Sequence, residues 1–194
     1  MKNKKSMARL IIIVSCVTIF IITSCSNSSE QVATPVNKAF AIAAPAYSDL
    51  AAKALTLFAS LDIDTWASML SDDVEYYFPD GDAGTRTVLK GKKKVTDFWK
   101  NWKATSGIQS MTYTNHVDIP VNSQDKLAYS GLTGVLVISY FSNKLVYNNA
   151  TIDLRMNFVA HFNEDSLIDR YYTYYDRTKI VQATKTNILD TKKN

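Results

Sequence analysis

Long stretches in which apolar and polar residues alternate fill the second half of the chain, and they constrain its fold more than any other feature. The alternation predicts four strands, at residues 110–121, 127–141, 145–162 and 167–176. Short polar segments separate these strands and predict turns, at residues 122–125, 142–144 and 163–165. Strands joined by short turns pair with antiparallel neighbours, so this half of the chain predicts a meander.

Apolar residues at helical spacing characterise the first half of the chain. They predict a helix from about Ser48 to Leu61, a short helix that ends near Leu70, and a third helix that follows Gly91. Two short strands, at residues 74–78 and 87–89, are predicted between the second and third helices. Helices followed by a meander indicate one α+β domain, in which the helices cover one face of a curved antiparallel sheet.

The N-terminus has the composition of a targeting segment. Residues 1–9 are basic and residues 10–22 are almost wholly apolar, a pattern typical of a secretion signal. The apolar run is shorter than the roughly 20 residues of a spanning helix, although a plain membrane anchor is the alternative. Residues 22–25 (ITSC) resemble the bacterial lipoprotein box, which implies that Cys25 receives lipid. The resemblance favours export and anchoring at the outer membrane, on its periplasmic face or its surface.

These features divide the chain into four predicted parts. We expect a lipoprotein signal peptide at 1–24, a flexible tether at 25–45, a folded domain at 46–180 and a polar tail at 181–194. Residues 39–44, inside the predicted tether, are apolar enough to form a first strand or a short helix on the domain instead.

Charge and cysteine content exclude several function classes. The formal charge of +4 comes from the leader, because four basic and no acidic residues lie in residues 1–24. The remainder is balanced, and nothing in it indicates a nucleic-acid partner. Both cysteines, Cys16 and Cys25, precede the domain, so it can form neither a disulfide nor a thiolate metal site. His116 and His161 have no carboxylate at ligand spacing, so we predict no metal and no cofactor.

Three stretches of the sequence together resemble the nuclear transport factor 2-like superfamily, in particular its SnoaL-like branch. Residues 70–81 (LSDDVEYYFPDG) match a short helix, an Asp-Asp pair, a strand and Pro-x-Gly; residues 89–92 (LKGK) open the third helix; and residues 168–176 (IDRYYTYYD) match a last strand that ends in two aromatics and Asp. The resemblance implies a cone-shaped sheet wrapped around N-terminal helices, with a pocket at its open end. The superfamily holds both enzymes and non-catalytic domains, so fold alone does not settle function.

The resemblance also implies where a ligand and a catalytic group would lie. We expect ligand-binding side chains in the cone, at Tyr76, Phe78, Trp99, Tyr172 and Tyr174. Phe78 occupies the position of the general base of ketosteroid isomerases, which excludes that mechanism because a phenyl ring takes no proton.

A catalytic pair remains a hypothesis on these grounds. Asp176 occupies the place of an acid of limonene epoxide hydrolases, and His116 is its predicted partner; the alternative is an Asp that caps or pairs at a strand end. Strand parity places Met111 and Tyr113 on one face with Val117 and Ile119, and His116 on the opposite face, which is either pocket or solvent.

The sequence is compatible with three hypotheses about function. The first is a membrane-tethered domain that binds a small, largely apolar molecule without established catalysis. The second is a hydrolase, lyase or isomerase that uses Asp176 with a tyrosine or His116. The third is a non-catalytic lipoprotein that forms a homodimer through the open face of its sheet.

Overall fold

The computed structural model of the protein describes residues 39–190. The chain divides into two units, residues 1–36 and 37–194. The predicted signal peptide, Cys25 and most of the predicted tether lie outside the described residues. The described part contains eleven elements: β1 (Phe40–Ile42), α2 (Ala46–Ala59), α3 (Ile63–Ala67), β2 (Leu70–Tyr77), β3 (Val88–Lys90), α4 (Lys92–Thr105), β4 (Ile108–Ser123), β5 (Gly134–Tyr147), β6 (Ala150–Phe162), β7 (Ile168–Tyr174) and α5 (Thr178–Thr184).

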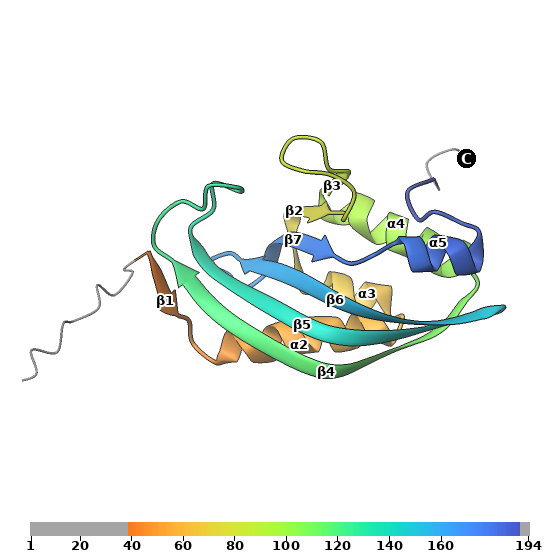
Figure 1. Ribbon diagram of the computed structural model, residues 1–194. Coiled ribbons are helices and arrows are strands. Elements are labelled where there is room, and N and C mark those ends of the chain that lie inside the picture. Colours follow the sequence, from red (N-terminus) through yellow and green to blue (C-terminus); the bar gives the residue numbers. More distant parts are fainter. Residues whose placement is uncertain (1–38, 191–194) are drawn as a thin grey trace, which may run out of the picture. The chain divides into compact units, whose positions relative to one another are not determined.

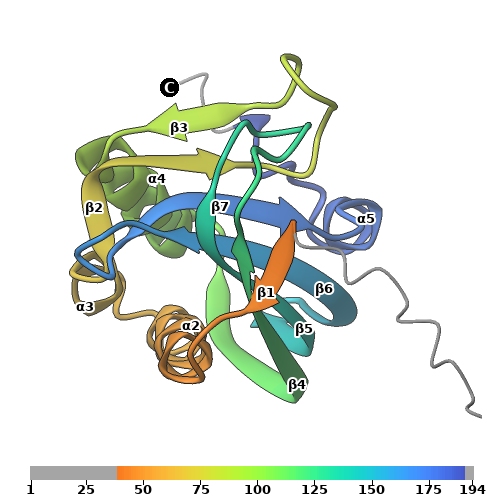
Figure 2. The same cartoon turned by 90° about the vertical axis from the view of Figure 1, so that its left-hand side faces the viewer.

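The strands form one curved, open sheet in the order β1-β4-β5-β6-β7-β2-β3 (Figure 1). Every neighbouring pair is antiparallel except β2 and β7, which are parallel. Helices α2, α3 and α4 lie on one side of the sheet (Figure 2). The predicted α+β architecture and its meander are therefore confirmed. No helix of residues 39–190 has the length and apolarity needed to cross a membrane.

The apolar spacing of each helix explains which side faces the sheet. Helix α2 buries Phe58 together with Leu55 and two alanines, and α4 buries Trp99, Trp102 and Val95. Asp62 is the N-cap of helix α3, and its side chain accepts a hydrogen bond from the backbone N–H of Thr65 at 3.1 Å.

The core between helices and sheet is aromatic. Phe58 of α2 contacts Trp66 and Trp99, with ring centres 5.0 and 4.7 Å apart. On the sheet side, Phe158 contacts Phe141 at 5.1 Å and Tyr171 at 5.5 Å, both edge to face. Such aromatic pairs contribute roughly 0.5–1.5 kcal/mol beyond the area that they bury. The aromatic residues of the sequence therefore hold the helices against the sheet.

The hairpin between β5 and β6 differs from the prediction. Residues 142–144 were predicted to form a turn, but β5 continues through them to Tyr147, and the chain reverses at Asn148 and Asn149. The polar sequence Ser-Asn-Lys was the reason for the wrong prediction. In the structure Asn143 lies inside the strand, buried, and opposite Tyr113 of β4. Residues 127–133, predicted as strand, form a loop instead.

A bulge in β4 overturns the predicted faces of this strand. The register with β5 shifts between Thr114 and Val117, and Asn115 has a left-handed φ of 49°. Met111 is 8% exposed before the bulge, whereas Val117 is 53% exposed after it. One extra residue reverses the alternation, so Val117 and Ile119 face outward and Asp118 lies opposite the buried Ser139.

Both ends of the folded unit extend beyond the predicted domain of residues 46–180. Strand β1, which lies inside the predicted tether, pairs with the end of β4, where Phe40 lies opposite Ser123. At the C-terminus, part of the predicted polar tail packs on the core, including Ile188 and Leu189. Residues 181–190 of the predicted polar tail therefore belong to the folded unit, because apolar side chains among them lie against the core.

Candidate functional site

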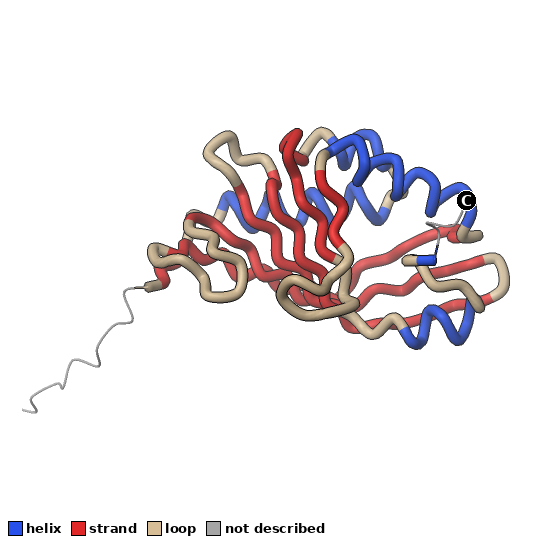
Figure 3. The backbone as a smooth tube through the Cα atoms, turned by 90° about the horizontal axis from the view of Figure 1, so that it is seen from above, coloured by secondary structure: helices blue, strands red, loops and turns tan. Residues whose placement is uncertain are grey.

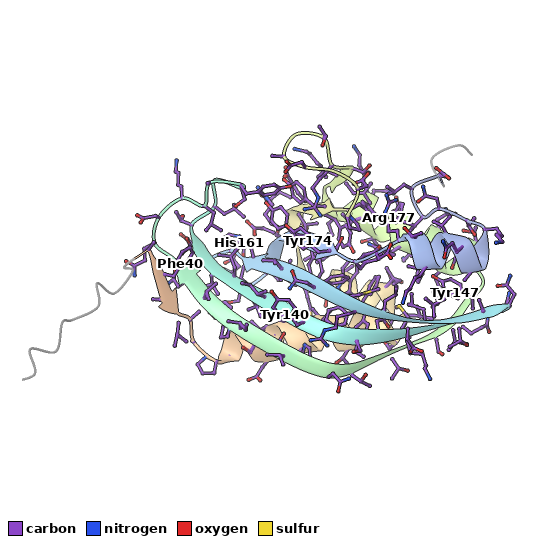
Figure 4. The ribbon with its side chains drawn as sticks, viewed as in Figure 1. Phe40, Tyr140, Tyr147, His161, Tyr174 and Arg177 are labelled. Atoms are coloured by element: carbon purple, nitrogen blue, oxygen red, sulfur yellow. The ribbon has the colours of Figure 1, made fainter. Side chains whose placement is uncertain are left out.

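A mostly apolar cavity of about 80 Å³ lies between the inner face of the sheet, α4 and the C-terminal segment. Its walls come from seven elements and the segments that follow α4, β7 and α5. They are formed by Phe58, Tyr76, Trp99, Trp102, Thr105, Ser106, Met111, Tyr113, Asn143, Leu145, Tyr147, Met156, Phe158, Tyr175, Ile180, Thr184, Thr186, Asn187 and Ile188. We call it the interior cavity. Tyr147 marks it in Figure 4, at the end of the sheet nearest α5.

The C-terminal segment, residues 178–190, closes one side of the interior cavity. It contributes five wall residues, from Ile180 to Ile188. No residue of α5 is fully buried, and this helix stands apart from the group of α2, α3 and α4 (Figure 3). Arg177 Nη1 donates to Asn187 Oδ1 at 3.0 Å and holds the segment in a turn. This wall is therefore attached more lightly than the helices of the core.

Three polar atoms of the interior cavity are buried without a hydrogen-bond partner in residues 39–190. They are Trp99 Nε1, Tyr113 Oη and Asn143 Oδ1. Tyr113 and Asn143 face each other across the β4–β5 ladder. Asn143 Nδ2 has only a weak contact, 3.7 Å from Met156 Sδ. An unpartnered buried polar group costs roughly 1–3 kcal/mol, so native proteins rarely keep three around one cavity.

The interior cavity has no charged side chain among its described walls, and its titratable groups are tyrosines. Burial, followed by neighbouring tyrosines, raises the pKa of Tyr76 and of Tyr113 well above the ordinary value. Burial raises the pKa of Tyr147 to about 12, and it also raises the pKa of Tyr175. These phenols are neutral at physiological pH, so they can donate or accept hydrogen bonds but cannot act as bases.

The structure does not bring the predicted catalytic pair together in the interior cavity. Asp176 is exposed and its Oδ1 accepts a hydrogen bond from the backbone N–H of Thr178 at 2.8 Å, where α5 begins. Hydrogen bonds from Thr178 lower the pKa of Asp176. The hypothesis of a desolvated acid with a raised pKa is therefore wrong, and Asp176 instead forms a local hydrogen bond just before Arg177, the N-cap of α5.

His116 lies just past the β4 bulge and does not line the interior cavity. Its Nε2 is 3.0 Å from Asp118 Oδ1, which also accepts a hydrogen bond from Ser139 Oγ at 2.5 Å. Asp118 thus has two partners on its own sheet. Sequence reasoning did not find this pair, because the bulge that turns Asp118 toward Ser139 leaves no clear signal in the sequence.

The five predicted ligand-binding residues separate into three groups. Tyr76 and Trp99 line the interior cavity. Phe78 is fully buried behind them, with Tyr76 and Phe98 at ring distances of 5.0 and 5.1 Å. Tyr172 and Tyr174 lie on the face of the sheet opposite the interior cavity. They alternate along β7 with Tyr171, which is part of the core, and alternate residues of a strand point to opposite sides.

The main wall residues that sequence reasoning missed are Tyr113, Asn143 and Tyr175. Tyr113 was placed on an apolar face, and its alternation was the available signal. Asn143 was predicted to lie in a turn, because its neighbours Ser142 and Lys144 are typical of turns. Tyr175 follows the end of β7, where strand parity no longer determines the direction of a side chain.

Comparison with known proteins gives fold relationships only. No family model matches the sequence, and no curated protein matches it either. Among solved structures, a candidate polyketide cyclase from Silicibacter matches with a TM-score of 0.54 at 16% identity, over 72% of this chain and 95% of that one. A candidate SnoaL-like polyketide cyclase from Shewanella denitrificans matches with a TM-score of 0.51 at 14% identity, over 74% of this chain and 100% of that one.

A third structure extends this relationship. A nuclear transport factor 2-like protein from Anabaena variabilis matches with a TM-score of 0.51 at 14% identity, over 69% of this chain and 91% of that one. At these identities the matches define the fold.

Proposed function

The chain has the fold of SnoaL-like proteins of the nuclear transport factor 2-like superfamily, and from this premise we propose that it binds a small, largely apolar molecule in the interior cavity. The ligand carries one polar group, a hydroxyl or a carbonyl. The proposal includes an exported protein held at the outer membrane through lipid on Cys25.

The observation that carries the proposal is the set of unpartnered atoms in an otherwise apolar, uncharged cavity. Trp99 Nε1 can donate a hydrogen bond, Asn143 Oδ1 can accept one, and the Tyr113 hydroxyl can do either. A ligand hydroxyl would accept from Trp99 and donate to Asn143. Ligand sites commonly combine apolar walls with a few convergent polar groups, as this cavity does.

The size of the interior cavity limits the ligand. About 80 Å³ is below the roughly 300–1,000 Å³ of pockets for drug-sized ligands. The ligand is therefore small, or the lightly attached C-terminal segment moves outward to admit it. Ile180 and Ile188 would then contact the guest.

Catalysis is supported less well than binding. The neighbours from Silicibacter and Shewanella are described as cyclase candidates, but the described walls of the interior cavity hold no carboxylate or imidazole. The enzyme hypothesis, which uses Asp176 with a tyrosine or His116, would need Asp176 to reach the ligand from outside these walls.

The binding proposal is tested by native mass spectrometry of the full chain released from detergent. We expect an additional mass from a co-purified small molecule in the natural protein. The Asn143→Leu variant, which removes the acceptor, should lose this mass. Asn101→Leu on the exposed side of α4 is the matched control. A natural protein that carries no guest, and gains none from a lipid extract of its host, would contradict binding.

The lipid anchor is tested by metabolic labelling with radioactive palmitate. The natural chain and the Cys16→Ser variant should both incorporate label, whereas Cys25→Ser should not. Two or more acyl chains hold a protein on a bilayer stably, at about 0.8 kcal/mol per buried methylene. Label that persists in Cys25→Ser would refute the assignment.

The outer face of the sheet favours a second proposal, a homodimer. Val117, Tyr140, Asn157 and Tyr174 lie side by side on four neighbouring strands, and the three apolar members are exposed. Patches of this kind often mark interfaces. Light scattering should give a dimer mass for the natural protein and a monomer mass for Tyr140→Lys, with Thr56→Lys on α2 as control. A natural protein that is monomeric at high concentration would remove this proposal.

A further inference from the structure

A buried arginine ties together two strand ends on the outer side of the sheet. Arg86, between β2 and β3, is only 9% exposed. Its Nε donates to the Phe78 carbonyl at 2.7 Å, and its Nη2 donates to the carbonyls of Thr173 at 2.8 Å and Tyr77 at 3.3 Å. These carbonyls lie where β2 and β7 finish their parallel pairing. The Nε and Nη2 donors of the guanidinium are thus both hydrogen-bonded.

The other edge of Arg86 has no anionic partner. Burial lowers the pKa of Arg86, but interactions with the Tyr129 and Tyr174 side chains outweigh this effect and raise the pKa. Nη1 is buried and forms no hydrogen bond with residues 39–190, and no carboxylate of these residues forms an ion pair with Arg86. Buried charges are nearly always paired, because taking an ion out of water is expensive. An anion is therefore the group that would compensate the charge of Arg86 best.

Aromatic rings surround the guanidinium. Its central carbon lies 4.8 Å from the ring centre of Tyr174 and 5.9 Å from those of Tyr77 and Tyr172. The Tyr77 and Tyr172 rings are stacked, 4.4 Å apart and 18° from parallel. Ring faces attract a cation, but they do not cancel its charge. They also provide flat apolar walls for a planar guest.

A cavity of about 280 Å³ adjoins this cluster, and we call it the outer cavity. It is lined by Arg86, Tyr77 and Tyr172 together with Asp82, Ala83, Gly84, Val88, Lys90, Tyr129 and Ser130. Tyr129 and Ser130 come from the loop of residues 124–133. Tyr172 and Tyr174 point to the side of the sheet opposite the interior cavity; Figure 4 marks Tyr174. The outer cavity is therefore a separate site.

We propose that the outer cavity binds a small aromatic carboxylate, with the carboxylate on Arg86 Nη1 and the ring against Tyr172 and Tyr129. The Ser130 hydroxyl, which accepts from Leu132 N at 3.4 Å, keeps its proton to donate to the same carboxylate. Lys90 is engaged with Glu75 at 2.8 Å, and Asp82 is also in the wall. These acids disfavour a dianion such as phosphate and favour a singly charged guest.

The Tyr129 side chain interacts with Arg86, so we expect it to move when a guest reaches Nη1. This side chain is exposed and its ring lies 6.3 Å from that of Tyr172. The loop that carries it has no regular secondary structure. A rotation of one exposed ring is a small change compared with a movement of the strands beneath it.

The probe for this site is benzoate, measured by calorimetry on the full chain in a neutral detergent. Benzoate should bind at least about tenfold more tightly than benzamide, which has the same shape without the charge. Inorganic phosphate should bind more weakly than benzoate. Binding should be unchanged in Asn143→Leu, which separates this site from the interior cavity.

Ser130→Asp tests the proposal without disturbing Arg86. The new carboxylate would supply the missing counter-charge, so it should raise the melting temperature and abolish benzoate binding. Ala128→Asp places the same charge in the same loop outside the outer cavity, and it should do neither. Arg86→Lys should weaken benzoate by at least about tenfold if it folds. The proposal is overturned if benzoate and benzamide bind equally, if phosphate binds more tightly, or if both Asp variants behave alike.

Discussion

The two cavities lie on opposite faces of the same strands and share a tyrosine-rich composition, yet their chemistry differs. On β2, Tyr76 faces the interior cavity and its neighbour Tyr77 faces the outer cavity. The interior cavity holds unpartnered polar atoms and no charge among its described walls, whereas the outer cavity holds the unpaired charge of Arg86. Aromatic residues therefore shape both sites, and the few polar groups between them decide what each can bind.

Both sites keep groups that a fold optimised for stability alone would remove. An unpartnered amide or a buried unpaired cation lowers the free energy of unfolding. Proteins accept such losses at functional sites. Asn143→Leu in the interior cavity and Ser130→Asp in the outer cavity should therefore stabilise the protein while they abolish binding.

The largest expected effect contrasts two adjacent residues of β5. Phe141 is 0% exposed on the inner face, and Tyr140 is 41% exposed on the outer face. Phe141→Ala should lower the free energy of unfolding by about 3–5 kcal/mol, because it leaves a void in a packed core. Tyr140→Ala should lower it by less than about 1 kcal/mol. Urea unfolding measures both, and equal losses would mean that the assignment of the faces is wrong.

Next in size is Asn143→Leu in the interior cavity. Leucine has a similar volume and no polar atom, so this variant should gain roughly 1–3 kcal/mol in the free energy of unfolding. Asn101→Leu on α4 should change it by no more than about 0.5 kcal/mol. If Asn143→Leu is instead destabilised, the amide has a protein partner, and the comparison between the two cavities fails.

A smaller effect should appear with pH, and only at the outer cavity. His161 lies at the base of its loop, with Nδ1 2.5 Å from Asp169 Oδ1 and Nε2 2.8 Å from the Thr133 carbonyl. Burial lowers the pKa of His161, but hydrogen bonds with Asp169 and Thr133 outweigh it, and the pKa is raised above 6.5.

Because the folded state favours the imidazolium, its stabilisation is complete below pH 6.5 and is lost as pH rises through the raised pKa. The melting temperature should fall between pH 6 and 9, and benzoate binding should weaken with it. Phenol is a suitable probe of the interior cavity, because it is small and carries one hydroxyl. Its binding should stay constant over this range. His161→Gln should flatten the pH dependence, whereas His116→Gln should retain it. A phenol affinity that follows the same pH curve would contradict the separation of the sites.

The smallest effect is expected for Asp176→Asn. Its carboxylate accepts a hydrogen bond at the start of α5, and Asp176 is not one of the wall residues of the interior cavity. Phenol affinity should change by less than about twofold, since α5 is merely loosened. A loss of binding as large as that of Asn143→Leu would return Asp176 to the site.

The sequence was sufficient for the sheet order of the meander and for the helical stripes, because burial leaves a period in the residues. The resemblance to the SnoaL-like branch then placed Trp99 and Tyr76 in the cavity. Asn143 and Asp118 could not be placed from the sequence. Asn143 lies in a strand whose residues are typical of turns, and Asp118 follows a bulge of one residue. Arg86 gave no signal, because its carbonyl partners on β2 and β7 meet only in the folded chain.

Ligand binding in the interior cavity is tested most directly by the indole resonance of Trp99 in residues 26–194, which retain every described element. Phenol fits the polar atoms of the interior cavity, and toluene has the same shape without the hydroxyl. Ligand binding through these atoms predicts that phenol shifts the Trp99 Nε1–H signal, leaves that of Trp66 in place, and binds at least about tenfold more tightly than toluene. Equal binding of the two, or no shift at Trp99, would contradict it.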